Sequence, residues 1–536
     1  MSIDPFILWT LKHSSVTNLM NIIEVFSEID RYQASIGIQQ AAQIVADAAR
    51  KAGVPVVEIH NFTADNKRQW WSFCAPQSWT PMHARLTVPG KPEFTIDHSM
   101  LPFALATYSR EASGKSYHLC TPQQDTFTPH DLVIIPAADF FHRNWQSDLC
   151  KSGAAGFITD AFARYDEHTQ SYYRGRIELT PGTPLFAFSL LPAELMSLLA
   201  TLTTISLAEV DILIDTTADM PVVSACQPGV EPQHEIWLTA HLCHARAGAN
   251  DNASGVSVLL EAARLIAQLQ SQKVIPPLRY TLRFVSGPEF TGVAALQYQL
   301  RHLPAPLVVI NLDMVGEDQA LCESPFCIER PPEAFDGTLV QLTEMLTEAV
   351  FTHTISGGGR WLTIPFQGFS DHALFMTHQD NHRNAPAIQI GHIDDRFNHC
   401  AADTPDKVSP LELQRTLSVV VPLILHLQRH TPQQLAPGQT ITSPKQPSNM
   451  HWSGPLNLRA FIETLPDSIR IPLQQRISRN KMYLALLHNC LIGADTRPWQ
   501  HIFTEVCNSL CLPADDDLHT LFDALFHPSF HIPGGN

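Results

Sequence analysis

Short apolar segments alternate with segments of helical periodicity between residues 208 and 430. The strand-like segments read EVDILID, EIWLTAH, YTLRFVS, LVVINLDMV and PAIQIG, and helical stretches at 253–270 and 291–302 lie among them. Apolar strands that alternate with helices are typical of a largely parallel sheet covered on both faces. We therefore expect an α/β fold with a mixed, largely parallel sheet, which binds ligands at the carboxyl ends of its strands.

The flanking regions have other patterns. Residues 17–53 have helical periodicity and end at a glycine before the apolar segment VPVVEIH. A second strand–helix–strand pattern follows in HDLVIIP, FHRNWQSDLCKSG and AAGFITD. Residues 431–452 are polar and proline-rich, as linkers are, which predicts few contacts between the helical tail and the rest. The predicted division is an N-terminal part of the main domain, an insertion, the main core, a linker and a small tail, at residues 1–110, 111–207, 208–430, 431–452 and 453–536.

Composition and charge narrow the classes of function. The chain has 536 residues, of which 44% are hydrophobic and 16% charged, as in ordinary globular proteins. A net charge of −17 argues against non-specific binding to nucleic acid or to an anionic membrane. No apolar run reaches the ~18 residues of a membrane helix, and the start does not resemble a signal peptide. The eleven scattered cysteines then indicate reduced thiols, so we expect a cytoplasmic protein.

Side chains that bind metals lie at or just beyond the ends of four predicted strands. These are His241, Glu289, Asp313 and His399, and a fifth, Asp251, lies in GANDNASG immediately before a helix. Two imidazoles and three carboxylates suit zinc, whereas an all-oxygen set would suit magnesium or calcium. Two zinc ions bridged by a carboxylate can polarise a carbonyl and activate water, which hydrolysis of an amide requires. The sequence therefore predicts a zinc site, with two ions favoured and one possible.

Several motifs together resemble those of a known family. HLCH, GANDNASG, NLDMVG, SDH and HCAADTPDKV are similar to motifs of the co-catalytic zinc aminopeptidases, a family that also contains the glutaminyl cyclases. The resemblance covers residues 17–90 and 208–430, and extends more weakly to a tail that is winged-helix-like in one bacterial branch. It implies a fold of the zinc exopeptidase type. Residues 111–207 resemble the protease-associated domain often inserted in such enzymes, and one more βα unit of the main sheet is the alternative.

The resemblance also implies roles for individual residues. His241 and Asp313 correspond to ligands of one metal, and Asp251 corresponds to the bridge. Glu289 and His399 correspond to the remaining ligands of the other metal.

The substrate pocket is predicted from two further segments. Asp371 and His372 of the SDH motif, together with Gly358 and Arg360 of a glycine-rich turn, are expected to line it. A turn with only a structural role is the alternative for the glycine-rich segment.

Two positions depart from the family pattern. The family has Glu-Glu where this chain has Pro288-Glu289, so Glu289 is either a metal ligand or the general base. We favour the ligand, with Glu317 and Asp318 as candidates for the vacant role. Cys243 stands where the family has an aspartate that orients the histidine ring, and either Cys243 or His244 is an alternative direct ligand.

The implied function is that of a zinc-dependent hydrolase, which removes N-terminal residues from peptides or cleaves a small peptide-like amide. A glutaminyl-cyclase-like acyl transfer at one zinc, held by Asp251, Glu289 and His399, is one alternative. A catalytically degenerate scaffold that binds peptides is the other. The acidic segment PADDDLH offers no basic recognition face, so the tail is expected to pack or to bind a partner protein rather than DNA. The pattern leaves the oligomeric state open.

Overall fold

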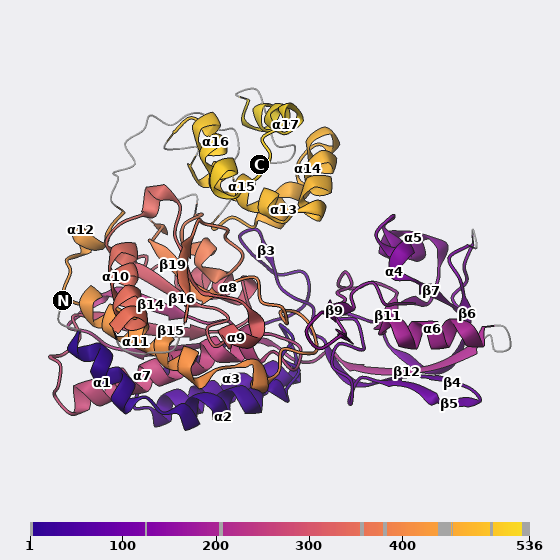
Figure 1. Ribbon diagram of the computed structural model, residues 1–536, viewed down its shortest axis with the longest axis horizontal. Helices are drawn as coiled ribbons and strands as arrows, with labels where there is room; N and C mark the ends of the chain where they lie inside the picture. The colour runs from indigo at the N-terminus through magenta and orange to yellow at the C-terminus, as the bar shows by residue number, and fades with distance from the viewer. Residues whose placement is uncertain are drawn as a thin grey trace.

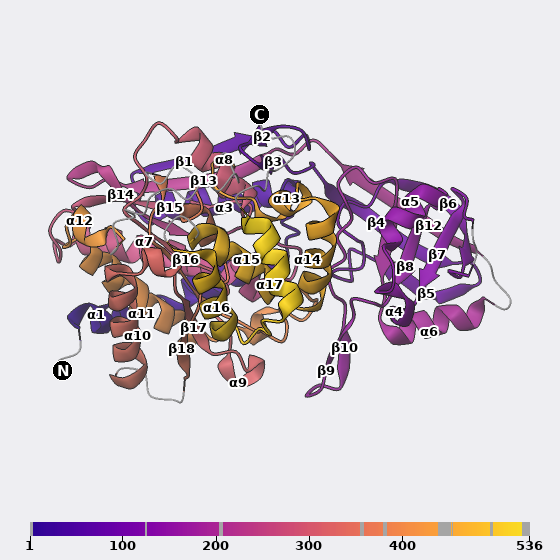
Figure 2. The same ribbon diagram turned by 90° about the horizontal axis from the view of Figure 1, so that it is seen from above.

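The protein has three parts in its computed structural model, which describes residues 4–123, 126–202, 207–353, 359–378, 383–437, 452, 454–493 and 497–527. A main α/β domain carries a second α/β domain at one side, and a helical C-terminal unit lies over the main domain (Figure 1). Seen from above, the C-terminal helices cover the main sheet while the second domain lies beside it (Figure 2). No described helix combines the length and apolarity needed to cross a membrane.

The main domain is built on an eight-stranded sheet in the order β1-β13-β15-β14-β16-β19-β17-β18. Its strands are β1 (Val56–Phe62), β13 (Met220–Gln227), β14 (Glu231–Thr239), β15 (Tyr280–Ser286), β16 (Val308–Leu312), β17 (Phe326–Glu329), β18 (Trp361–Ile364) and β19 (Ala387–His392). The four central strands β15, β14, β16 and β19 are mutually parallel. The strands on either side of them, β13 and β17, run antiparallel to their central neighbours β15 and β19. The predicted mixed, largely parallel sheet is therefore confirmed.

Helices cover both faces of this sheet, because successive strand residues point to opposite sides. Ile236 and Leu238 of β14 pack into one core, while Trp237 between them packs into the other. The first core is covered by α1 (Pro5–His13), α2 (Val16–Ser27), α3 (Ile36–Lys51), α7 (Gly255–Ser271), α10 (Thr338–His353), α11 (Pro410–Leu427) and α12 (Pro432–Leu435). The second is covered by α8 (Thr291–Gln299), the 3₁₀ helix η3 (Asp371–Phe375) and the small pair β2 (Gln69–Trp70) and β3 (Phe73–Cys74).

The second domain has a separate seven-stranded sheet, in the order β11-β8-β7-β6-β12-β4-β5. Its elements are β4 (Thr80–Val88), β5 (Lys91–Asp97), β6 (Ala112–Cys120), β7 (Asp131–Ile135), α4 (Ala137–Phe140), α5 (Trp145–Ser152), β8 (Gly156–Thr159), β11 (Phe186–Ser189), α6 (Pro192–Thr201) and β12 (Leu207–Asp215). A hairpin, β9 (Arg164–Asp166) and β10 (Ser171–Tyr173), projects outward near the junction of the two domains (Figure 2). A separate sheet excludes the alternative of one more βα unit in the main sheet.

The boundary of this domain differs from the predicted one. Strand β12 pairs with β4 on one side and β6 on the other, so residues 80–97 complete the second sheet. The sequence analysis assigned these residues to the main domain and began the insertion at residue 111. The pairing joins segments more than 100 residues apart, which a local hydrophobic pattern does not show.

The C-terminal unit consists of five helices around its own core. They are α13 (Leu458–Glu463), α14 (Asp467–Arg479), α15 (Met482–Gly493), α16 (Trp499–Ser509) and α17 (Asp516–Phe526). No strand is assigned within residues 454–493 and 497–527, the described part of this unit. Most of the predicted linker, residues 438–451, lies outside the described residues.

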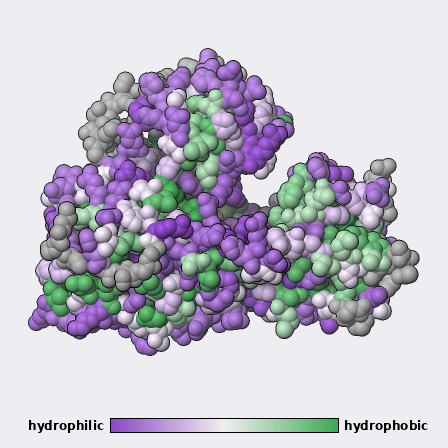
Figure 3. Space-filling model, in the orientation of Figure 1, coloured by the Kyte–Doolittle hydropathy of each residue, from purple (hydrophilic) through white to green (hydrophobic). Residues whose placement is uncertain are grey.

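The C-terminal unit is attached to the main domain by several direct contacts. Nδ2 of Asn489 donates to the carbonyl of Phe366 at 3.0 Å, and Nε1 of Trp452 donates to the carbonyl of Thr377 at 2.9 Å. The rings of Phe366 and His488 lie 5.2 Å apart. These contacts attach the unit at a few points, and the prediction that few contacts join the tail to the rest stays a prediction. An open notch separates this unit from the second domain on one face of the molecule (Figure 3).

Candidate metal centre

The order of the parallel strands brings the predicted ligands together. His241 follows β14, Asp313 follows β16, and His399 lies on the loop after β19. Since these strands are parallel neighbours, their carboxyl ends meet at one edge of the sheet. Asp251 lies in η1 (Ala249–Ser254), the turn that leads into α7.

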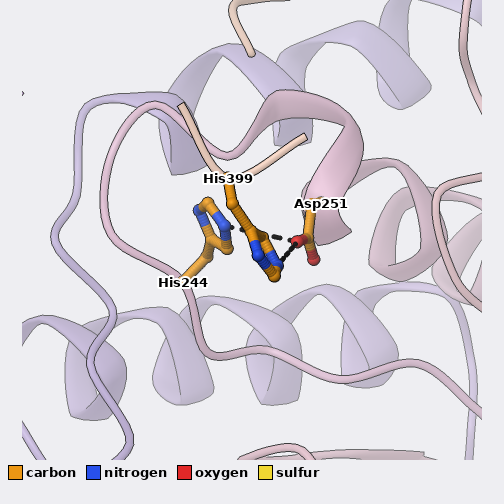
Figure 4. A group of neighbouring side chains, drawn as sticks. All are labelled: His244, Asp251 and His399. Carbon is orange, nitrogen blue, oxygen red and sulfur yellow. Dashed lines mark ion pairs between the residues drawn. The ribbon is translucent and has the colours of Figure 1, made fainter. Parts of the chain in front are cut away.

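Asp251 occupies the middle of the site and is shared by two groups of side chains. Its Oδ1 lies 3.1 Å from Nε2 of His241, which in turn lies 3.2 Å from Oδ1 of Asp313. Its Oδ2 lies 3.3 Å from Nε2 of His244 and 3.1 Å from Nε2 of His399. The two histidines of the second group turn their rings toward the carboxylate (Figure 4). Each group brings three ligand atoms within 4.8 Å of one another, as one metal ion requires.

The protonation of His244 indicates that the second group is built for a cation. Nδ1 of His244 lies 2.6 Å from the carbonyl oxygen of Ala245, and a carbonyl only accepts, so Nδ1 carries the proton of the neutral ring. The lone pair of Nε2 then faces Asp251, and this nitrogen makes no hydrogen bond. These two atoms face each other favourably only when a cation, either a proton on Nε2 or a metal ion, lies between them. A backbone carbonyl that fixes the ring in this way is typical of zinc-binding histidines, so the residues fit zinc.

The charges around His241 and Asp251 also favour a bound cation. Burial acts to raise the pKa of Asp251, but the imidazoles of His244 and His241 hold it well below its ordinary value. Burial acts to lower the pKa of His241, but the charges of Asp313 and Glu289 raise it well above its ordinary value. The centre therefore concentrates negative charge in a buried place, which favours binding of divalent cations.

Side-chain hydrogen bonds hold the turn that carries Asp251. The carboxylate of Asp403 accepts the backbone N–H groups of Asn250 at 2.7 Å and Asp251 at 3.0 Å. Asn252 donates to the carbonyl of Leu312 at 2.9 Å and so ties the turn to the end of β16. The sequence analysis missed Asp403 as a positioning residue, although it lies in the motif HCAADTPDKV.

Backbone constraints shape the two histidine segments. Gly248 has a φ of 61°, and a Cβ at this position would lie 2.5 Å from Nδ1 of His244, so a larger residue would displace that ring. The second domain holds the other histidine, since the N–H of Arg176 donates to the carbonyl of His399 at 3.2 Å. The N–H of Ala401 donates back to the carbonyl of Arg174 at 2.8 Å. The His399 side chain is 40% exposed, so the centre opens to solvent on this side.

Glu289 lies beside the two groups without belonging to either. Its N–H donates to Sγ of Cys243 at 3.2 Å, and the next N–H, of Phe290, donates to Oδ1 of Asp371 at 2.6 Å. Burial raises the pKa of Glu289 to about 8, and the carboxylate of Asp313 acts in the same direction. The sequence predicted Glu289 as the second ligand beside His399. In the structure, His244 lies beside His399 instead, and His244 as a direct ligand was one of the predicted alternatives.

The predicted pocket residues have different surroundings. Asp371 is buried beside the Glu289 turn, and burial raises its pKa to about 6. His372 faces away, with Nε2 2.8 Å from Oε1 of Glu329. Arg360 is exposed at the start of β18, the edge strand, and donates to the carbonyl of Glu323 at 3.2 Å.

Other predicted residues also lie away from the two groups. Gly358 lies outside the described residues. Asp318 accepts the N–H of Ala320 at 2.9 Å and so caps the short helix α9 (Gln319–Cys322). The lining role of all four pocket residues stays a prediction.

The part of the chain that carries both ligand groups is similar to a known family of peptidases. Residues 222–424 match the model of Peptidase family M28, and this range contains every residue of both groups. The main domain is thus similar to the M28 peptidases over these residues.

Within this class, the chain is 31% identical over 148 residues to aminopeptidase YwaD of Bacillus subtilis (strain 168). That match covers 26% of this chain and spans only 29% of the relative's length.

Solved structures of the same class share the fold. BSAP, a zinc aminopeptidase from Bacillus subtilis, is 18% identical with a TM-score of 0.53, over 78% of this chain and 97% of that chain. A candidate peptidase from Clostridium acetobutylicum is 15% identical with a TM-score of 0.55, over 88% of this chain and 97% of that chain. At these identities the likeness concerns the fold alone.

Proposed function

We propose that the chain is a two-zinc aminopeptidase, or an amidase that acts on a small peptide-like substrate. The observation that carries this proposal is the position of Asp251, whose two carboxylate oxygens face two separate ligand groups. The similarity to an aminopeptidase of Bacillus subtilis supports the substrate class.

Each zinc ion would have three protein ligands. His241, Asp313 and Asp251 would hold one ion, and His244, His399 and Asp251 would hold the other. Three protein ligands leave a coordination position open, which is typical of catalytic rather than structural zinc. His244 thus replaces the glutamate that the family pattern places at the second ion.

Zinc at these positions would polarise the scissile carbonyl and make water more acidic. Glu289 supplies the complementary function, since its carboxylate can take the proton of the attacking water and deliver it to the leaving amine. Burial raises the pKa of Glu289 toward the neutral range, in which a general base is most effective. The Cys243 thiol and the Asp371 carboxylate accept the two successive backbone N–H groups at Glu289 and so fix the backbone that carries it. Asp371 is therefore a positioning residue in this proposal.

The other two parts of the chain have supporting roles in the proposal. The second domain is of the protease-associated type and forms one wall of the centre, since the ring of Phe103 lies 6.0 Å from that of His244. The C-terminal unit packs against the main domain, and its winged-helix-like character stays a prediction. All eleven cysteines are unpaired, which supports the proposed location in the reducing cytoplasm.

Metal analysis combined with a panel of substrates tests the proposal. Two zinc ions at the centre around Asp251 and release of anilide from aminoacyl-anilides, with no release after N-terminal blocking, would support the aminopeptidase. Two zinc ions with cleavage of blocked amides would support the amidase. One zinc with cyclisation of N-terminal glutamine would favour the acyl transferase, and peptide binding without zinc would favour the scaffold.

A further inference from the structure

A second group of potential metal ligands lies apart from the M28-type centre. Glu317, Cys322 and Asp395 each offer a ligand atom, and these atoms all lie within 4.8 Å of one another. All three residues are buried. None of them belongs to the two groups around Asp251.

Glu317 shows that the group lacks a component. The residue is 0% exposed, and among the described residues no donor makes a hydrogen bond of good geometry to either carboxylate oxygen; its polar neighbours are the hydroxyl of Ser324 and the carboxyl group of Asp395. Burying an ionised carboxylate without a partner costs several kcal/mol, so such groups are normally paired, protonated or bound to a cation. The carboxyl groups of Asp395 and Asp403 lie close enough to add to its negative charge rather than to compensate for it.

The group connects the two loops that carry ligands of the M28-type centre. Glu317 lies four residues after Asp313, and Asp395 lies four residues before His399. Cys322 ends α9, which follows Glu317 almost directly, so that both residues belong to the loop after Asp313. An ion bound here would cross-link both loops at a point outside the reacting centre.

We propose that Glu317, Cys322 and Asp395 form a third metal site, which binds a divalent transition ion of the zinc class. One thiolate with two carboxylates suits zinc or cobalt, because a soft thiolate disfavours magnesium and calcium. Binding releases the thiol proton of Cys322 and any proton on the carboxyl groups to solvent, and no electron is transferred. The ion's role is structural: it fixes the ligand loops of Asp313 and His399.

Protonation of the carboxyl groups is the alternative to a bound metal ion, because it also neutralises their charge. Burial raises the pKa of Glu317 to about 12, and the neighbouring Asp395 carboxyl adds to the effect. In that arrangement the carboxyl groups share a proton and no ion binds. The two arrangements differ in metal stoichiometry and in whether the thiol binds the ion.

Cobalt(II) titration of the metal-free full-length chain distinguishes them. A thiolate bound to cobalt absorbs in the near ultraviolet, whereas the nitrogen and oxygen ligands around Asp251 do not. We expect this absorption in the wild type. In Cys322→Ser and Glu317→Gln the absorption should disappear, and each variant should bind one equivalent of cobalt fewer. Cys243→Ser and Cys511→Ser are the matched thiol controls and should retain both the absorption and the stoichiometry.

Three results would overturn the third site. They are no thiolate absorption in the wild type, its persistence in Cys322→Ser, or its loss in Cys243→Ser. Glu317→Gln replaces the buried charge with an amide of the same size, so it remains informative if Cys322→Ser does not fold. The absorption is independent of turnover, so failure of the proposed peptidase activity would leave this result unaffected.

Discussion

Nε2 of His244 lies 3.3 Å from Oδ2 of Asp251, with its lone pair directed at the carboxylate. The Ala245 carbonyl holds the proton on the opposite ring nitrogen, so the two residues do not share a hydrogen bond. This arrangement fits two ligands to one ion. It supports the proposal that His244 binds the second metal, alongside His399.

We therefore expect His244→Ala to bind one zinc fewer than the wild type. Loss of a residue that merely orients a ligand lowers metal affinity by about 10–100-fold, so loss of a direct ligand should lower affinity by at least ~10²-fold. Activity should fall in parallel and recover partly in excess zinc. Zinc content by mass spectrometry, with kcat measured across a zinc titration, checks both.

Cys243→Ser is the control for His244→Ala, because it alters the neighbouring residue and keeps a small side chain. It should retain both zinc ions. If His244→Ala retained full zinc content while Cys243→Ser lost an ion, the thiol would be the ligand instead.

Glu289→Gln tests the assignment of the base. The substitution keeps the size of the side chain and removes its capacity to accept a proton. As Glu289 lies outside both ligand groups, zinc content should be unchanged while kcat falls by ~10²–10⁴-fold, the usual contribution of a general base. Glu323→Gln, at an exposed position, should leave both quantities at the wild-type level.

The opposite result for Glu289→Gln is equally informative. Loss of one zinc, with activity partly restored by added zinc, would show that Glu289 is a ligand, as the family pattern alone suggested.

Much of this centre could be predicted from the sequence, since strand ends are visible as changes from apolar to polar residues. His241, Asp313 and His399 were predicted in this way and Asp251 from its position before a helix, and the structure brings all four together. The position of His244 depends instead on a backbone pairing with Arg31, at 2.7 and 2.8 Å, across more than 200 residues. The role of Glu317 was equally hidden, because a carboxylate in a loop is usually exposed and this one is buried.

Removal of the C-terminal unit tests whether it is part of the main folding unit. A chain ending at residue 437 exposes Phe366 and loses the hydrogen bonds from Trp452 and Asn489. We expect its melting temperature to fall by about 5 °C or more, since 1 kcal/mol corresponds to roughly 2–4 °C in a domain of this size. Calorimetry of the two chains measures the difference.

Arg497→Ala provides the matched control for truncation. It removes the partly exposed ion pairs with Glu333 and with Glu505, each at 2.9 Å, and such pairs contribute about 0–1 kcal/mol each. An unchanged melting temperature in the truncated chain would show that the C-terminal unit folds and unfolds independently.

The last prediction concerns the pH dependence of that attachment. Burial, with His372 nearby, lowers the pKa of His488 to about 3 in the folded chain, against about 6.5 in an unfolded one. Between these values the unfolded chain binds a proton that the folded chain does not, so stability rises with pH and is lost as pH falls below about 6.5. For this residue alone, going from pH 7 to pH 5 should lower the free energy of unfolding by about 2 kcal/mol.

Urea unfolding at pH 7, 6 and 5 measures this dependence of stability on pH. His488→Leu should reduce it, whereas His501→Gln, at an exposed position, should not. Identical slopes in His488→Leu and the wild type would mean that His488 is protonated, or accessible to water, in the folded chain.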